Sequence, residues 1–290
     1  MMEKFCIYNE RFHAMRAAKD ILIASHRGSA GIPIVDNTVE SFECAIAQHA
    51  DILEMDISMS TDGKLFVIHD GMELRLFHIP GNVQTMTGEQ IRHLEYFNMN
   101  AAHTGLHPNT LDEVLECLKD RCMLNFDRSW VHQNERLKWK NIFKTVARHG
   151  MEDQVIYKTP AAPKYAEMFA DVDIPYLYMP MVRCIDEVTP FLHASVNIVA
   201  AEVHFSEDRD FLARPEHYEF LRQKGIYIWA NALTLGASCG ELAGGHDDKT
   251  AMLGNPDAGW GYFLEQGFDI VQSDYVPQIV QYYRSRGCRI

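Results

Sequence analysis

Short apolar runs recur along the chain and alternate with segments in which apolar residues return every three or four positions. Runs that are apolar throughout are typical of strands that are covered on both faces of a parallel sheet. Eight such runs are present, at residues 21–24, 52–57, 123–127, 155–158, 176–179, 198–202, 226–230 and 269–273. Eight strands alternating with helices over 290 residues predict a TIM (β/α)8 barrel, with an open doubly wound sheet as the second choice.

The segments between these runs carry the periodicity of amphipathic helices. Residues 39–46 place apolar side chains on one face, and the sequence predicts Asn37 as the N-cap with Glu40 reaching back to it. Residues 111–118 repeat the apolar face clearly, and residues 213–221 do so more weakly.

One apolar run, residues 65–68, interrupts the alternation of strands and helices. It follows the second strand after only Thr61-Asp62-Gly63, which is too short for a parallel crossover. Because an Asp-Gly pair between extended runs indicates a hairpin, we expect this run to return antiparallel. The hairpin would carry His69 back toward Glu54 and Asp56.

Residues 72–107 lack clean periodicity and contain the pair Pro80-Gly81. We interpret them as an insertion over the barrel mouth. We therefore expect residues 1–290 to form one barrel domain, because a chain of this length can bury the core of a single barrel.

Net charge, cysteine spacing and the lengths of the apolar runs limit the partners and the cellular compartment that we expect. The formal net charge of −13 repels nucleic acid and anionic membranes, so a small anionic substrate would need local positive charge. The seven cysteines include no C-x-x-C pair, which excludes a zinc ribbon and agrees with a reducing compartment. No apolar run approaches a membrane span, and residues 1–19 have no signal-peptide core. We therefore expect a cytoplasmic protein without stable membrane insertion, whose oligomeric state the sequence leaves open.

Three carboxylates stand on or at the ends of the predicted strands, Glu54, Asp56 and Asp127, which we call the acidic triad. Glu54 and Asp56 are two positions apart and share one strand face, which in a barrel is the interior near the catalytic end. Close carboxylates repel unless a cation neutralises them, and their oxygens suit Mg²⁺ or Ca²⁺. Asp127 is a natural third ligand. The alternatives are a solvated strand end or an ion pair with lysine for the first two, and a helix N-cap for Asp127.

His26 and His69 are the candidates for proton transfer, because imidazole titrates near neutrality. Arg27 offers a planar fork for phosphate oxygens. The alternatives are structural hydrogen bonds for the histidines and an ordinary salt bridge for the arginine. A serine hydrolase or a zinc protease is disfavoured, because the chain has neither a Gly-x-Ser-x-Gly elbow nor a His-Glu-x-x-His helix.

Later strands end on further polar groups. Lys158 ends the fourth barrel strand, where an ammonium that faces the interior would need an anionic partner. Glu202 occupies a similar position, and Trp229 and Asn231 follow near the end of the seventh strand. These last three residues are candidates for a substrate pocket.

In order and spacing, these residues resemble the glycerophosphodiester phosphodiesterase family, in a divergent bacterial form. The family's successive motifs are His-Arg-Gly, Glu-Asn-Thr, Glu-x-Asp, Thr-x-Asp-Gly and His-Asp. They correspond here to His26-Arg27-Gly28, Asp36-Asn37-Thr38, Glu54-Met55-Asp56, Thr61-Asp62-Gly63 and His69-Asp70.

The resemblance implies a TIM barrel with a small insertion after the His-Asp motif, acting on a small phosphodiester substrate. It implies that His26 and His69 are the general acid and base. It also implies that the acidic triad holds one divalent cation and that Arg27 contacts the phosphate. The reaction would hydrolyse a glycerophosphodiester to an alcohol and glycerol phosphate.

The chain departs from the family pattern on the third barrel strand. The family has Glu-x-Lys there, whereas this chain reads Asp127-Arg128-Ser129. We hypothesise that Lys158, on the adjacent strand, supplies the missing ammonium to the substrate phosphate.

Two other functions compete with this one. A phospholipase-D-like or cyclising phosphodiesterase on the same barrel would need an apolar rim, which the insertion could supply through Leu74, Leu76, Phe77, Ile79 and Phe97. A barrel that only binds a phosphorylated ligand is disfavoured, because both histidines and all three carboxylates are present.

Overall fold

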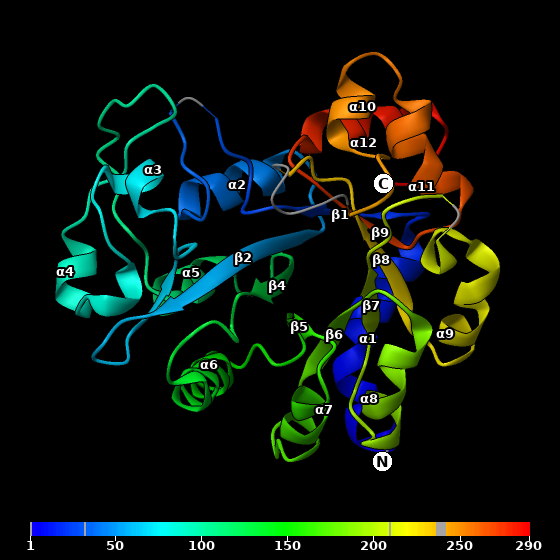
Figure 1. Cartoon of the computed structure of the whole chain (residues 1–290), viewed down its shortest axis with the longest axis horizontal. Helices are drawn as coiled ribbons and strands as arrows, with labels where there is room; N and C mark the ends of the chain where they lie inside the picture. Colours follow the sequence, from blue (N-terminus) through cyan, green and yellow to red (C-terminus); the bar gives the residue numbers. More distant parts are fainter. Residues whose placement is uncertain (1, 32, 209, 236–241) are drawn as a thin grey trace.

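Eight parallel strands close into a barrel in the computed structural model, which describes residues 2–31, 33–208, 210–235 and 242–290. Around the barrel the strands follow the order β1, β2, β4, β5, β6, β7, β8, β9, and β1 pairs with both β2 and β9 (Figure 1). The strands are β1 Leu22–Ser25, β2 Ile52–Met59, β4 Met123–Asp127, β5 Val155–Pro160, β6 Leu177–Val182, β7 Ala200–Val203, β8 Tyr227–Asn231 and β9 Ile270–Ser273. The predicted TIM barrel is confirmed.

Helices alternate with these strands. They are α1 Met2–Ala18, α2 Val39–Ala47, α5 Leu111–Leu118, α6 Glu135–His149, α7 Pro163–Ala170, α8 Thr189–His193, α9 Glu219–Gln223, α10 Asp248–Met252, α11 Tyr262–Glu265 and α12 Val276–Ser285. The weak pattern at 213–221 corresponds to the 3-10 turn Pro215–Tyr218 followed by α9. A π-helical turn, Asp257–Gly261, precedes α11 and contacts α10, and α10, α11 and α12 lie together at the top of Figure 1.

The predicted N-cap of α2 is wrong by one residue. Thr38 is the N-cap, and its side chain accepts a hydrogen bond from the backbone N–H of Ser41, whose hydroxyl completes the capping box in place of Glu40. Asn37 instead donates to the carboxylate of Asp56, 2.8 Å away. The Asn37 side chain, which the local pattern assigned to the N-cap of α2, therefore binds a carboxylate of the acidic triad instead.

The hairpin prediction is confirmed. Strand β3 (Leu65–Val67) runs antiparallel to β2, and the backbone N–H of Ile68 donates to the carbonyl of Asp56 at 2.9 Å. The following segment contains α3 (Glu73–Phe77), the 3-10 turn Val83–Thr85 and α4 (Gly88–Arg92), which lie together beyond one end of β2 in Figure 1. A separate apolar cluster joins this segment to β3 and to the residues that follow it; it includes Phe66, Ile68, Leu76, Phe77, Val83, Ile91 and Tyr96.

The barrel interior has an apolar floor. Leu22, Ile52, Met123, Ile156 and other inward-facing residues form one buried cluster, which Phe12 of α1 joins. Helix α1 therefore contributes to the core at the end of the barrel opposite the strand C-termini.

Two further observations concern the chain as a whole. Within the described ranges, no helix combines the length and apolar character that crossing a membrane requires. The six described cysteines are free thiols, and the seventh, Cys239, lies outside the described residues.

Candidate active site

Inward-facing positions change from apolar to ionisable toward the C-terminal ends of the strands. On β2 the sequence on this face is Ile52, Glu54, Asp56, because alternate residues of a strand point to the same side. Strand β4 places Asp127 beside Asp56 in the paired register. The hairpin-linked strands β2 and β3 and the neighbouring β4 thus supply charged groups to one mouth of the barrel.

The acidic triad is brought together. One carboxylate oxygen from each of Glu54, Asp56 and Asp127 lies within 4.8 Å of the others. Glu54 and Asp56 are each 1% exposed, whereas Asp127 is partly open to solvent. Glu54 accepts a hydrogen bond from the backbone N–H of Arg27 at 3.0 Å. The triad therefore has a buried side, anchored to the chain, and an open side.

Burial and neighbouring charges shift the pKa values of the two buried carboxylates of the triad in opposite directions. Burial, together with the neighbouring Asp56 carboxylate, raises the pKa of Glu54. Burial also opposes ionisation of Asp56, but the charges of Arg27 and His69 outweigh it and lower the pKa of Asp56. Asp56 therefore favours its charged form, whereas Glu54 favours its protonated form unless a nearby cation stabilises its negative charge.

Arg27 supplies positive charge next to the triad. Its Nε lies 2.9 Å from Oδ2 of Asp56, and a terminal nitrogen lies 3.8 Å from Asp36. Arg27 itself has a positive φ of 56°, and Gly28 follows with a φ of 80°. A Cβ on Gly28 would lie 2.4 Å from the hydroxyl of Ser41, so this turn requires glycine.

Lys158 lies on the other side of the triad. Its ammonium forms ion pairs with Asp127 and, at 3.2 Å, with Glu202. Burial disfavours the ammonium, but the charges of Asp127 and Glu202 outweigh burial and raise the pKa of Lys158. The anionic partner that this strand-end lysine required is therefore present.

Glu202 connects Lys158 to the later strands. Its second oxygen lies 2.7 Å from Nε2 of His204 and accepts from Asn231 at 3.0 Å. Burial opposes ionisation, but Lys158 and then His204 outweigh it and lower the pKa of Glu202 to about 2. The ring of Trp229 has no exposed surface and packs in the apolar floor, with its N–H donating to Asn231. His204, two residues beyond Glu202 on the same face, was not identified from the sequence.

His26 is bound by a carboxylate from the far end of the chain. Its Nδ1 lies 2.8 Å from Oδ1 of Asp274, which follows β9. Burial works against the charged imidazole, but the hydrogen bond and charge of Asp274 outweigh it, and the pKa of His26 is raised. The pattern that could have identified Asp274 is its place two residues after the inward-facing Gln272.

His69 has the opposite environment. Its Nδ1 lies 2.7 Å from the carbonyl oxygen of Asp70, which can only accept, so Nδ1 carries the hydrogen and leaves Nε2 as the acceptor of the neutral ring. Burial lowers the pKa of His69, and the Asp56 charge offsets this only in part. One histidine thus favours the charged form and the other favours the neutral form.

Two basic residues that the sequence did not single out fix the loop after β4. Arg128 has a positive φ of 54°, and its Nε lies 2.7 Å from the carboxylate of Asp70. Lys138 is fully buried and donates to the carbonyl oxygens of Ile57, Arg128 and Val131. These contacts hold the loops that carry His69 and Asp127 together.

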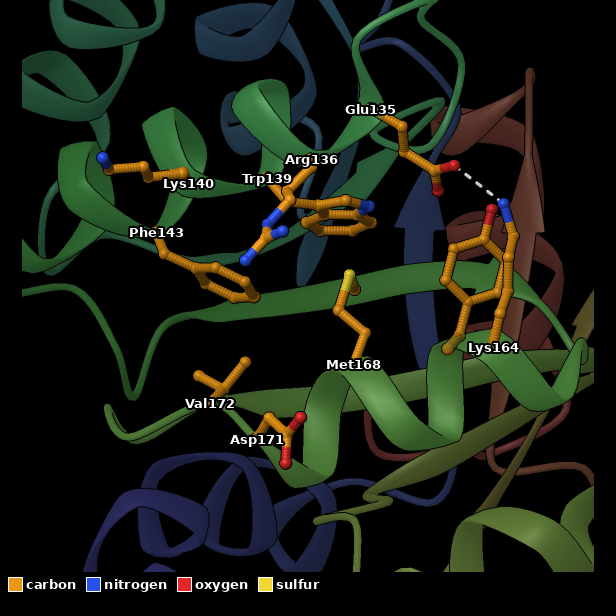
Figure 2. Close-up of a pocket in the computed structure, with 10 residues that line it drawn as sticks. Glu135, Arg136, Trp139, Lys140, Phe143, Lys164, Met168, Asp171 and Val172 are labelled. Atoms are coloured by element: carbon orange, nitrogen blue, oxygen red, sulfur yellow. Dashed lines mark hydrogen bonds and ion pairs between the residues drawn. The ribbon is translucent and has the colours of Figure 1, made fainter.

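A hollow of about 580 Å³ lies elsewhere, on the outer wall between α6 and α7 (Figure 2). Trp139, Phe143, Met168 and Val172 form its apolar wall, and Glu135 pairs with Lys164 at its edge. None of the residues that line it is a histidine or belongs to the acidic triad. The candidate site is therefore the barrel mouth and not this hollow.

The residues of the triad fit a divalent metal ion. Three carboxylates offer hard oxygen ligands and two of them are buried; burial and then the Asp56 charge raise the pKa of Glu54, and a bound cation would favour its charged form. Asp127 is the partly exposed member of the triad, and the Lys158 ammonium pairs with its Oδ2.

Comparisons with known proteins agree with this barrel and its motifs. Residues 26–220 match the glycerophosphoryl diester phosphodiesterase family, and residues 178–283 match a domain of unknown function. A glycerophosphodiester phosphodiesterase of Bacillus subtilis is 35% identical over 105 residues, which cover 33% of this chain and 36% of that one. The chain thus spans about a third of that relative's length.

Two solved structures share the fold. A glycerophosphoryl diester phosphodiesterase from Parabacteroides distasonis aligns with a TM-score of 0.73 and 16% identity, over 94% of this chain and 92% of that one. A phosphodiesterase from Oleispira antarctica aligns with a TM-score of 0.65 and 18% identity, over 91% and 96%. The chain is a (β/α)8 barrel with ionisable groups gathered at its mouth. It belongs to the glycerophosphoryl diester phosphodiesterase family.

Proposed function

We propose that this protein hydrolyses small glycerophosphodiesters to an alcohol and glycerol phosphate, with a divalent metal ion bound by the acidic triad. The observation that carries the proposal is the gathering of two histidines and the acidic triad at one barrel mouth, where His26 is paired with the carboxylate of Asp274 and His69 with the carbonyl of Asp70. Family membership supports the reaction class, and the structure of the Oleispira antarctica phosphodiesterase is a complex with the product sn-glycerol-3-phosphate.

The positive groups at the mouth bind the phosphate. A cation held by the triad, Mg²⁺ or Ca²⁺, would neutralise charge that develops on a nonbridging phosphate oxygen. Arg27 is already held by Asp56 through its Nε, and its guanidinium would bind the phosphate oxygens. Lys158 would add an ammonium from β5, in place of the lysine that the family carries on the preceding strand.

The two histidines divide the proton transfers. His69 keeps Nε2 as an acceptor and takes the proton from the attacking oxygen. His26 stays protonated because Asp274 stabilises its imidazolium, and it donates the proton to the departing alkoxide. Each group is then in the protonation state that its environment favours.

The test follows glycerophosphocholine by ³¹P NMR with purified protein and Mg²⁺. The proposal predicts that the diester signal is replaced by the monoester signal of glycerol phosphate. His26→Asn and His69→Asn should each lower kcat by about 10²-fold or more, whereas His93→Asn, at an exposed histidine of α4's C-cap, should not. Absence of the monoester, or full activity in both variants, would refute the proposal.

The same assay distinguishes the two rival reactions. An accumulating five-membered cyclic phosphate signal would indicate the cyclising route. Hydrolysis of lysophosphatidylcholine in preference to glycerophosphocholine would indicate the phospholipase-D-like route.

A further inference from the structure

Asp248 is a buried carboxylate outside the motifs of the site. It is the first residue of α10, it is 1% exposed, and it lies within residues 178–283, which match a domain of unknown function. A buried carboxylate is costly unless its oxygens are satisfied. The hydrogen-bond partners of Asp248 therefore indicate its role.

Among the described residues, three donors bind the side chain of Asp248: two come from the C-terminal end of β9 and one from the π-helical turn Asp257–Gly261. Oδ1 accepts from the hydroxyl of Ser273 and from the indole N–H of Trp260, each at 2.7 Å. Oδ2 accepts from the backbone N–H of Asp274 at 2.9 Å. Ser273 also accepts from the backbone N–H of Tyr275 at 2.9 Å. Asp248 thus fixes the backbone on both sides of the residue that binds His26.

Asp274 needs this support, because its own side chain is 44% exposed. Its carboxylate lies at the solvent-exposed mouth of the barrel, so packing alone does not fix its rotamer. The backbone N–H bond to Asp248 sets the position from which that carboxylate reaches His26 at 2.8 Å.

Asp248 is itself rigidly placed. Its backbone N–H donates to the carbonyl of Ala232 at 2.6 Å. The π-helical turn that carries Trp260 packs so closely on α10 that a Cβ on Gly259 would lie 2.7 Å from the Cβ of Ala251. Both the carboxylate and its tryptophan donor are therefore held by packing.

We propose that Asp248 is a positioning residue for the reaction, which acts through Asp274 to orient His26. The inference rests on the proposed function, since His26 is the general acid there. It assigns a role within the site to a residue of α10, which lies beyond the range 26–220 that matches the family. Supporting groups of this kind commonly change activity 10- to 100-fold when they are removed.

The test is a double-mutant cycle in the full-length protein with glycerophosphocholine as substrate. Asp248→Asn keeps the shape, but in either orientation its amide NH₂ faces an N–H donor, that of Asp274 or that of Trp260, so the network loses at least one hydrogen bond. We expect kcat to fall about tenfold or more with KM within about twofold. In an Asp274→Asn background the same change should cost nothing further.

A matched control separates positioning from stability. Asp51 is also buried and also binds a backbone N–H, that of Ile23, but at the opposite end of the barrel. Asp51→Asn should lower the melting temperature and leave kcat unchanged. Equal kcat values for the Asp248 and Asp51 variants would overturn the proposal, as would losses at Asp248 and Asp274 that multiply.

An NMR measurement tests the inference without measuring turnover. In protein labelled with [¹³Cε1]-histidine, the His26 signal is assigned by its loss in His26→Gln. It should move in Asp248→Asn and stay in place in Asp51→Asn. If the wild type hydrolyses no glycerophosphodiester, the proposed function fails while this measurement still decides the role of Asp248: an unmoved signal overturns it.

A second variant serves if Asp248→Asn does not fold. Ser273→Ala removes one donor to Asp248 and leaves the carboxylate in place. We expect it to move the His26 signal in the same direction and to lower kcat by about two- to tenfold, the value of one hydrogen bond. An unchanged signal and an unchanged kcat would overturn the proposal.

Discussion

Nδ1 of His26 lies 2.8 Å from Oδ1 of Asp274, although the two residues are 248 positions apart in the chain. The contact exists because β1 and β9 pair in parallel and close the barrel, with Ser25 opposite Ser273. The next residue of each strand then reaches the same mouth. Closure of the barrel is therefore what gives His26 its carboxylate partner.

This pairing predicts the shape of the pH profile. The charged form of His26 is stabilised, so the general acid is lost as pH rises through its raised pKa, and this gives the alkaline limb. The pKa of His69 is lowered, so the base is lost only as pH falls below its ordinary range, and this gives the acid limb.

Asp274→Asn should move the alkaline limb of kcat/KM to lower pH, because the His26 imidazolium loses its anionic partner. The acid limb should keep its position. The measurement is kcat/KM for a glycerophosphodiester on both sides of neutrality. An alkaline limb that stays where it is in the variant would contradict the assignment of His26 as the acid.

Lys158→Met tests whether the ammonium on β5 serves the phosphate. We expect kcat to fall by about 10²-fold or more, as for the loss of a donor to developing negative charge. Lys164→Met, at an exposed lysine on α7, should leave kcat unchanged. Near-normal turnover in Lys158→Met would exclude this role.

The same substitution also leaves Glu202 as a buried charge without its ammonium. Breaking a buried pair in this way lowers the free energy of unfolding by about 3–5 kcal/mol. Lys158→Met/Glu202→Gln should recover part of that stability, measured by urea unfolding, without recovering kcat. Recovery of both would mean that Lys158 acts only through stability.

Gly28→Ala tests the turn that presents Arg27. The φ of 80° and the 2.4 Å approach to the Ser41 hydroxyl both oppose a Cβ. We expect the free energy of unfolding to fall by about 1–3 kcal/mol and KM to rise as Arg27 shifts. Gly71→Ala is the control for backbone strain alone, since Gly71 has a φ of 85° and nothing within 4 Å of a Cβ. Equal losses of stability in the two variants would show that contact with Ser41 is unimportant.

The sequence was sufficient for the elements that depend on local pattern. Apolar runs located the eight barrel strands, and Asp62-Gly63 predicted the hairpin that carries His69 beside Asp56. Both patterns are formed by residues that are close together in the sequence, so one sequence is enough to recognise them.

Contacts between distant segments could not be predicted in the same way. Asn37 fitted a helix cap locally, but Thr38 caps α2 and the amide binds Asp56. Asp248 and Asp274 lie far from the motifs, and only the closed barrel brings Asp274 to His26. The roles of the predicted site residues remain predictions, which the variants above test.

The central claim is that the acidic triad works with a divalent cation. The most direct test is glycerol phosphate release from glycerophosphocholine by protein that has been dialysed against EDTA, before and after addition of Mg²⁺ or Ca²⁺. The account predicts that release stops in EDTA, returns with one of these ions, and does not return in Asp56→Asn. Release at an undiminished rate in EDTA would contradict it.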